Sequence, residues 1–471
     1  MKPLVRTAES HLNDWFDGPR RKPLVIRGAR QVGKSTLVRQ FAWARGLPTL
    51  EVNLEQHRRL ESVFATFDVS AILLELEAIG RVAPSSGTIV FLDEIQATPS
   101  AIAALRYLHE QRPDLPVIAA GSLLEIVLQS PKFSMPVGRI EYLHLGPLTF
   151  REFLLAVGDT DLVDLSSRWS PGDPWADGAH RRLAARQREF LLVGGMPEAV
   201  AAFAAGEGIE SVRRVHRSIV ATYRDDFGKY GPSPASLVRL QTVFDFIPSA
   251  LGQKIKYANI SRDERAREVR AGLDLLALAR VVWKVHHGDC SGVPLEAQLD
   301  PHIYKCLFLD VGLATHMTGV DWSTLGRWDD RQLVHEGGLA EQFVGQHLLF
   351  RKNGLELPSL CYWLREGKDT NAEVDFVISS GRSVVAVEVR SGAAGSLRSV
   401  HQFLARGAKA VVPLAMRLDL NPPSLSEHEH SLADGRTLRY RLLSLPLYLV
   451  EQADRLLGEL VTAYQVGEGK R

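Results

Sequence analysis

The chain has 471 residues, of which 45% are hydrophobic and 24% are charged. This length exceeds one ordinary hydrophobic core, so two or three domains are expected, and the balanced composition excludes disordered and fibrous proteins. The formal net charge of +1 excludes a global field that would attract nucleic acid or acidic lipid. Any basic binding surface must therefore be local.

The three cysteines, Cys290, Cys306 and Cys361, show no CxxC spacing. This pattern argues against a disulfide framework or a zinc site and favours a reducing compartment. The sequence begins without an apolar stretch of signal-peptide length, and no uncharged apolar run reaches the ~18 residues of a membrane span. We therefore expect a cytoplasmic protein without a membrane partner.

The first region, residues 1–157, alternates strand and helix patterns, which is typical of a parallel sheet covered on both faces. Short apolar runs bounded by turns predict its strands, and longer periodic stretches predict its helices. The expected strands cover residues 23–27, 48–52, 88–92, 116–120 and 139–145, and the expected helices cover 34–44, 56–66, 70–82 and 100–111.

Beyond this region the pattern changes twice. Residues 158–178 are rich in Gly, Pro, Asp and Ser and predict a loop or insertion. Residues 180–330 are mainly helical in pattern, and 235–285 would fold as a small helical bundle or a winged helix. Residues 331–471 return to strands, with apolar runs at 374–378 and 384–389. The expected fold class is therefore α/β, with a helical or winged-helix-like middle region.

The loop after the first strand matches the phosphate-binding pattern GxxxxGK[ST], in the strand–loop–helix context that the motif requires. Backbone N–H groups of such a loop surround phosphates, and the following helix adds positive potential at its N-terminus. Lys34 would contact the β- and γ-phosphates of ATP, and the Ser35 hydroxyl would bind Mg²⁺. The predicted nucleotide-binding residues are Gly28, Ala29, Arg30, Gln31, Val32, Gly33, Lys34, Ser35 and Thr36.

Two acids, Asp93 and Glu94, directly follow the apolar run at 88–92. Ligands of open α/β sheets bind at this carboxyl end of the strands. Asp93 is predicted to act on the Mg²⁺ ion, and Glu94 is predicted to polarise the attacking water. Adjacent acids after a strand also occur in solvated turns, so this pair alone would be weak evidence. Its position about sixty residues after a phosphate loop makes the assignment strong.

Two further polar residues have two interpretations each. Ser122 follows the run at 116–120 and would sense the γ-phosphate, cap a helix, or do both. Arg139 precedes the fifth expected strand and would act as an arginine finger, or be an ordinary surface arginine.

Several motifs in this order resemble a family of prokaryotic AAA-type P-loop ATPases that carry a C-terminal PD-(D/E)XK nuclease-like domain. They are GARQVGKS, FLDEIQ, AAGSLLE, GRIEYLHLGPLTFREFL, GGMPEAV, EVDFVI and VEVR, and they span nearly the whole chain. The resemblance implies an ATPase domain at 1–157, a helical or winged-helix-like region at 180–330 and a restriction-nuclease-like α/β domain at 331–471. It also implies a homo-oligomer in which a neighbouring subunit supplies an arginine.

In such a nuclease, two carboxylates hold Mg²⁺ and a lysine orients the water or stabilises developing charge. The matching positions here are Asp375 and Glu388, with Glu341 as a third acid, but Arg390 occupies the lysine position. Arginine is planar and does not deprotonate, so it is no equivalent replacement. We expect cleavage to be weak or absent, and the acids are alternatively ordinary strand-end residues.

Within the stretch 259–282, four arginines would track DNA phosphates, namely Arg262, Arg265, Arg267 and Arg270, but interspersed acids favour a salt-bridged, solvated helix face. This stretch also shows no obvious turn between two helices. The preferred function is an ATP-hydrolysing switch or motor acting on a partner, either DNA or another protein. The alternatives are an ATP-regulated nuclease, a non-hydrolysing nucleotide-binding scaffold and, last, a small-molecule kinase.

Overall fold

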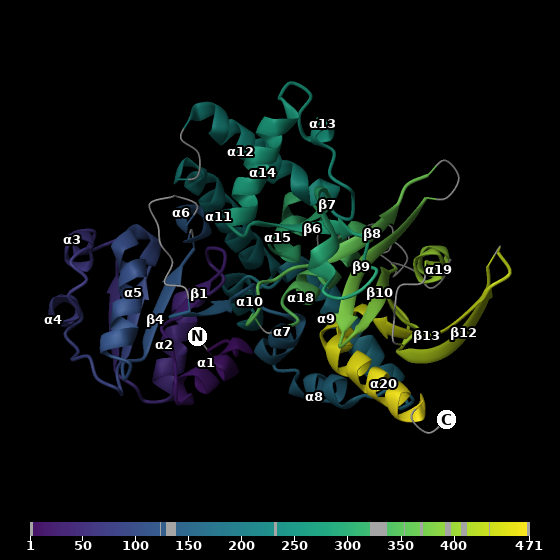
Figure 1. Cartoon of the computed structure of the whole chain (residues 1–471), viewed down its shortest axis with the longest axis horizontal. Coiled ribbons are helices and arrows are strands. Elements are labelled where there is room, and N and C mark those ends of the chain that lie inside the picture. The colour runs from purple at the N-terminus through teal and green to yellow at the C-terminus, as the bar shows by residue number, and fades with distance from the viewer. Residues whose placement is uncertain are drawn as a thin grey trace.

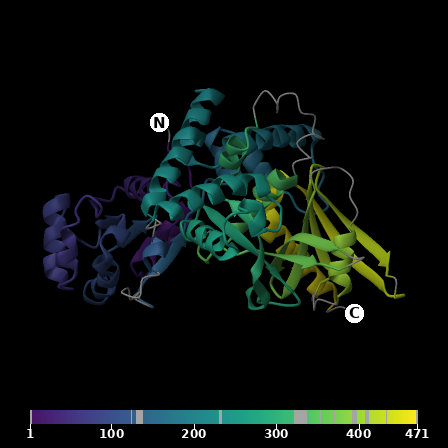
Figure 2. The ribbon, with the colours of Figure 1, turned by 90° about the horizontal axis from the view of Figure 1, so that it is seen from above.

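The computed structural model describes residues 3–122, 124–128, 138–229, 233–320, 337–352, 354–367, 371–390, 397–406, 412–432 and 434–468. Two sheets lie toward opposite ends of the molecule, and the helices of the middle region lie between them (Figures 1 and 2). None of the described helices is long and apolar enough to cross a membrane.

The N-terminal sheet is parallel, with the strand order β2-β3-β4-β1-β5. All five expected strands are confirmed, and every residue of β3 and β4 is buried, as expected for central strands covered on both faces. The strands are β1 (Leu24–Arg27), β2 (Thr49–Asn53), β3 (Ile89–Asp93), β4 (Val117–Gly121) and β5 (Glu141–His144). The helices are α1 (Ala8–Asp17), α2 (Lys34–Ala44), α3 (Leu60–Phe64), α4 (Val69–Gly80), α5 (Pro99–Gln111) and α6 (Leu124–Leu128).

The segment 158–178 was expected to be a loop or insertion, and the loop prediction holds mainly for residues 169–176. It contains the helix α8 (Thr160–Arg168), which buries Leu162, Val163 and Ser166 on one face. Asp161 and Asp164, which contributed to the loop pattern, lie on the opposite, exposed face of this helix.

The middle region is helical up to residue 278, as expected. A break at residues 261–265 separates α13 from α14, although the sequence pattern showed no obvious turn there. The helices are α7 (Phe150–Ala156), α8, α9 (Asp177–Val193), α10 (Pro197–Ala204), α11 (Ile209–Asp226), α12 (Pro234–Phe246), α13 (Tyr257–Ile260), α14 (Ala266–Leu278) and α15 (Val311–Met317).

The second sheet has the strand order β12-β13-β11-β10-β9-β8-β6-β7 and is mixed. Two of its strands, β6 (Val282–Gly288) and β7 (Leu299–Phe308), fall within the range 180–330 that was expected to be helical or winged-helix-like. The boundary expected near residue 330 lies outside the described residues. The remaining strands are β8 (Cys361–Arg365), β9 (Ala372–Ser380), β10 (Ser383–Val389), β11 (Leu414–Asp419), β12 (Ser424–Ser431) and β13 (Thr437–Pro446), and the helices of this part are α18 (Gly337–Leu349), α19 (Arg398–Ala405) and α20 (Ala453–Glu468).

Candidate nucleotide-binding site

A cavity of about 670 Å³ lies beside the phosphate loop, at the carboxyl edge of the N-terminal sheet. The loop follows β1, Asp93 ends β3, and Ser122 follows β4, which lies between those two strands. Residues from the middle region complete the wall. The lining includes Arg30, Gly33, Lys34, Ser35, Thr36, Glu94 and Ser122 from the first region, and Pro197, Glu198, Ala201 and Thr222 from α10 and α11.

Two glycines fix the shape of the loop. A Cβ atom on Gly28 would lie 2.2 Å from the carbonyl oxygen of Leu145, so only glycine fits there. Gly33 adopts φ 91°, which is left-handed backbone that favours glycine, and it leads directly into α2. The sequence motif therefore has a steric cause in this chain.

Lys34 is buried at the start of α2. Its ammonium group donates hydrogen bonds to the carbonyl oxygens of Gly28 at 3.1 Å and Ala29 at 2.7 Å. Burial lowers the pKa of Lys34 to about 8, although Glu94 and Asp93 oppose this shift. The ammonium group therefore loses its proton more easily than that of an exposed lysine. In a nucleotide complex, phosphate oxygens would replace the two loop carbonyls as its hydrogen-bond acceptors.

Ser35 and Asp93 lie side by side, as the metal assignment requires. The Ser35 hydroxyl donates a hydrogen bond of 2.9 Å to Oδ2 of Asp93. Burial raises the pKa of Asp93, so a nearby cation would stabilise the ionised form of this carboxylate. A hydroxyl and a carboxylate at this spacing fit the hard oxygen ligands that Mg²⁺ prefers.

Glu94 follows Asp93 with left-handed backbone at φ 52°. Its Oε2 atom accepts hydrogen bonds from the amide of Gln96 and, at 3.4 Å, from the Ser122 hydroxyl. The structure therefore brings Ser122 to Glu94. Gln96 also orients this carboxylate, and we did not foresee it from the sequence.

Arg139 lies elsewhere. It precedes β5, at the amino edge of the parallel sheet, opposite the edge that carries the phosphate loop. Its side chain is about half exposed and pairs with Glu110 of α5 at 3.0 Å. Arg139 does not line the cavity of its own chain.

Two ion pairs around the loop, one buried and one partly buried, were also missed. Arg6 pairs with Glu152 at 3.1 Å and donates a hydrogen bond to the carbonyl oxygen of Val32. Arg30 pairs at 2.9 Å with Asp226, at the end of α11. Their partners lie more than a hundred residues away along the chain, so no sequence spacing could indicate them.

A second polar cluster lies in the C-terminal sheet, where the nuclease-like residues were expected. The ammonium group of Lys305, on β7, lies 3.1 Å from Glu341 and 3.8 Å from Asp375, and also pairs with Glu373. Glu388 pairs with Arg390. The cluster thus contains a lysine from a distant strand, which reasoning about the local motif missed, as it missed Glu373.

Three acids of this cluster, Glu341, Asp375 and Glu388, repel one another and have little exposed surface. Burial raises the pKa of Glu341 to about 8 and that of Glu388 to about 8, with Asp375 contributing to both shifts. Oε2 of Glu388 is buried without a hydrogen-bond partner. Within the described part of the chain, however, no three metal-ligating side chains are arranged to hold one ion.

Comparison with known proteins divides the chain into three parts. Residues 20–154 match the model of an AAA domain. This match supports an AAA-type P-loop ATPase domain. Residues 184–324 and 336–418 match two domains of unknown function, DUF8612 and DUF4143. These two matches do not test the nuclease-like resemblance of the C-terminal region, and no curated protein matches the chain.

Solved structures share low similarity with the chain. RuvB of Thermotoga maritima, in a variant form, is 15% identical with a TM-score of 0.29, and the match covers 60% of this chain and 90% of that one. The ORC1 protein of Aeropyrum pernix in complex with DNA is 15% identical with a TM-score of 0.26, covering 68% and 94%. AMPPCP-bound DnaA of Aquifex aeolicus is 11% identical with a TM-score of 0.28, covering 59% and 89%.

Proposed function

We propose that the chain binds ATP with Mg²⁺ and hydrolyses it, and that this cycle switches the arrangement of the middle region. The observation that carries the proposal is the meeting of four residues around one cavity beside the phosphate loop, namely Lys34, Ser35, Glu94 and Ser122, with Asp93 hydrogen-bonded to Ser35. Hydrolysis in P-loop proteins depends mainly on positioning and charge stabilisation, and these residues supply both.

Each residue has a definite task in this proposal. Backbone N–H groups of the loop and the Lys34 ammonium hold the phosphates, while Ser35 and Asp93 hold the Mg²⁺ ion, which neutralises phosphate charge. Glu94 accepts a hydrogen bond from the attacking water and aligns it with the γ-phosphate. Ser122, which donates to Glu94, makes the position of that carboxylate sensitive to the bound phosphate.

The switch rests on contacts between the phosphate loop and the middle region. Glu198 on α10 and Thr222 on α11 line the same cavity as Lys34. Arg30, within the loop, pairs with Asp226 at the end of α11. A γ-phosphate that draws Arg30 toward itself would weaken this ion pair, so α11 would change position between the ATP and ADP states.

A second route connects the sheet edge with α14. Glu125, on α6 just after Ser122, pairs with Arg280 at 2.8 Å and with Arg27 at 3.7 Å. Arg280 directly follows α14 and precedes β6, and Arg27 precedes the phosphate loop. The partner, DNA or another protein, would bind the surface that these helices move.

Steady-state ATP hydrolysis, with and without duplex or single-stranded DNA, tests this function. Turnover that Lys34→Ala abolishes and that DNA stimulates would support a DNA-coupled switch. Turnover indifferent to DNA would favour a protein partner. Turnover no higher than that of Lys34→Ala would contradict hydrolysis and favour a nucleotide-binding scaffold.

An ATP-regulated nuclease is the second candidate, and Lys305 is the observation in its favour. The Lys305 ammonium lies near Glu341 and Asp375. It would act as the lysine that the nuclease motif requires, for which Arg390 is no equivalent replacement. Arg390 and the lack of a three-ligand group among the described residues oppose it, so cleavage is expected to be weak or absent.

The matching test is cleavage of labelled DNA with Mn²⁺ or Mg²⁺ at pH 7 and pH 9, with Glu388→Gln as the control. The raised pKa values of Glu341 and Glu388, each about 8, keep these carboxyls protonated at neutral pH. Their affinity for a cation therefore increases as the pH rises through 8. Cleavage that increases with pH and is lost in Glu388→Gln would favour the nuclease, and no cleavage at either pH would exclude it.

A further inference from the structure

Two of the three cysteines lie in contact although 71 residues separate them along the chain. The Sγ atoms of Cys290 and Cys361 are 3.7 Å apart, and both side chains are buried. Cys306, which is buried as well, has no thiol neighbour among the described residues. A disulfide needs an S–S distance of about 2 Å, so a small side-chain movement would join the first two sulfurs.

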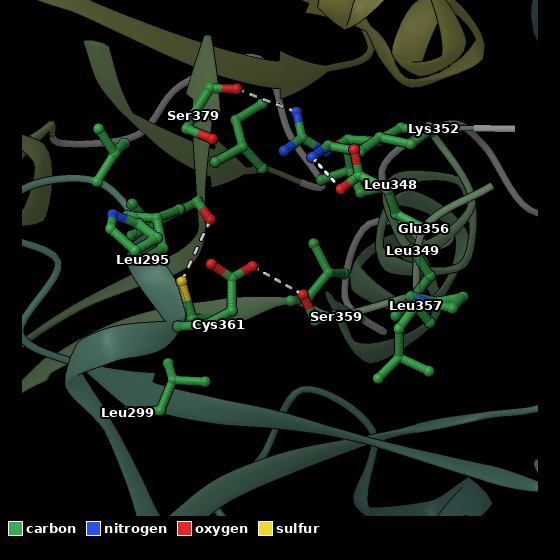
Figure 3. Close-up of a pocket in the computed structure, with 18 of the residues that line it drawn as sticks. Leu295, Leu299, Leu348, Leu349, Lys352, Glu356, Leu357, Ser359, Cys361 and Ser379 are labelled. Atoms are coloured by element: carbon green, nitrogen blue, oxygen red, sulfur yellow. Dashed lines mark hydrogen bonds and ion pairs between the residues drawn. The ribbon is translucent and has the colours of Figure 1, made fainter. Parts of the chain in front are cut away.

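Cys361 lines a cavity of about 630 Å³. Figure 3 shows it beside Leu295, Leu299 and Ser359, across the cavity from Lys352 and Leu357. The cavity is a route by which a small molecule reaches the Cys361 sulfur, whereas Cys290 does not line it. The two thiols therefore differ in access, one facing the cavity and the other behind it.

Cys290 has a cationic neighbour. Arg406 pairs with Asp289 at 3.0 Å, and its guanidinium interacts electrostatically with Cys290. The Cys290 sulfur is also in contact with that of Cys361, so it is placed to act as a resolving thiol, one that attacks an oxidised partner.

We propose that Cys361 and Cys290 form a redox site that a small oxidant such as hydrogen peroxide converts into a disulfide. The Cys361 sulfur attacks the O–O bond, which gives a sulfenic acid and one water. The Cys290 sulfur then attacks the Cys361 sulfur, the S–S bond forms, and the hydroxyl leaves as a second water. The two thiols lose two electrons in total, the peroxide gains them, and a thiol reductant reverses the change.

The location gives this bond a structural effect. Strand β6 joins β8 through only two register pairs, His286 with Cys361 and His287 with Tyr362. This short junction connects the β6–β7 hairpin with the rest of the C-terminal sheet. A Cys290–Cys361 disulfide would fasten the hairpin across its shortest pairing and would restrict the unfolded chain by closing a 71-residue loop.

The rate of oxidation should depend on pH. The hydrogen bond with Cys290 and burial raise the pKa of the Cys361 thiol. Because the thiolate is the reacting form, the disulfide should form slowly at neutral pH and faster as the pH rises.

The test is oxidation of the folded protein with hydrogen peroxide or diamide, followed by alkylation, digestion without reduction and mass spectrometry. We expect a Cys290–Cys361 cross-linked peptide, with Cys306 recovered as a free thiol. The melting temperature should rise by several degrees on oxidation and return with dithiothreitol. Cys306→Ala is the matched control, since it removes a buried thiol and should leave the cross-link unchanged.

Three outcomes would overturn the proposal. They are three free thiols after oxidation of the folded protein, a cross-link that includes Cys306, and a disulfide between two chains. Cys290→Ala and Cys361→Ala should each abolish the oxidation-dependent rise in melting temperature. Because the cross-link is mapped in the wild-type protein, the test stands even if a variant folds poorly.

Discussion

At the scale of single residues, Lys34 shows how the site balances burial against charge. A buried lysine loses solvation, and burial accordingly lowers its pKa to about 8. Glu94 and Asp93 oppose the shift by their negative charges, which favour the ammonium form of Lys34. The phosphates of ATP would provide further negative charge and favour the ammonium form.

This balance predicts a pH dependence of ATP affinity. The ammonium form binds phosphate and is lost as the pH rises through about 8, so the affinity for Mg–ATP should fall between pH 7 and pH 9. Titration calorimetry at both values measures it. Lys34→Ala removes charge-assisted hydrogen bonds and should weaken binding by about 10- to 100-fold, with little dependence on pH. An affinity of the wild type that is equal at both pH values would contradict this explanation.

At the scale of helices and strands, local patterns predicted the N-terminal sheet well. The loop Gly28–Ser35, the acids after β3 and Ser122 after β4 were found from sequence because each follows an apolar strand and the strands are parallel. Their meeting at one edge follows from the strand order.

Features that depend on distant pairing could not be predicted in this way. Lys305 lies next to Glu341 only because β7 forms the edge strand of the C-terminal sheet, beside β6. No local pattern reports which sheet a strand enters. The helix α8 was missed for a different reason, since its exposed face is rich in residues that also favour loops.

The Glu125–Arg280 pair gives a prediction at this scale. Both side chains are largely buried and lie 2.8 Å apart, so Glu125→Gln should lower the free energy of unfolding by about 1–3 kcal/mol. Urea denaturation of Glu125→Gln, Arg280→Gln and the double variant measures the interaction, and the double variant should cost less than the sum of the two single changes.

The exposed pair Arg139–Glu110 is the matched control for that measurement. Its partners are 3.0 Å apart but 48% and 34% exposed, so Glu110→Gln should lower the free energy of unfolding less than Glu125→Gln does. Strictly additive effects of Glu125→Gln and Arg280→Gln would contradict a direct contribution of their pairing.

At the scale of the whole molecule, the nucleotide cavity lies where the AAA-type domain meets the middle region. Its walls come from both parts, so under the proposed function a nucleotide would contact α10 and α11 as well as the phosphate loop. Arg139 lies at the opposite edge of the sheet, which leaves a neighbouring copy of the chain as the site where it would act.

Complementation between two inactive variants tests this assembly. Arg139→Ala should reduce hydrolysis by about 10³-fold while ATP binding persists, because an arginine finger acts on the transition state. Mixing it with Lys34→Ala should restore part of the activity, since intact loops would then meet intact arginines. Full activity of Arg139→Ala alone, or no recovery on mixing, would contradict a role in a neighbouring site.

The central claim is that this cavity hydrolyses ATP by means of Glu94. Comparing ATP binding with steady-state hydrolysis in Glu94→Gln tests it most directly, since glutamine keeps the size of the side chain but cannot accept the proton of the attacking water. We predict near wild-type binding of Mg–ATP and hydrolysis reduced by about 100-fold or more. Hydrolysis of Glu94→Gln at the wild-type rate would contradict the claim.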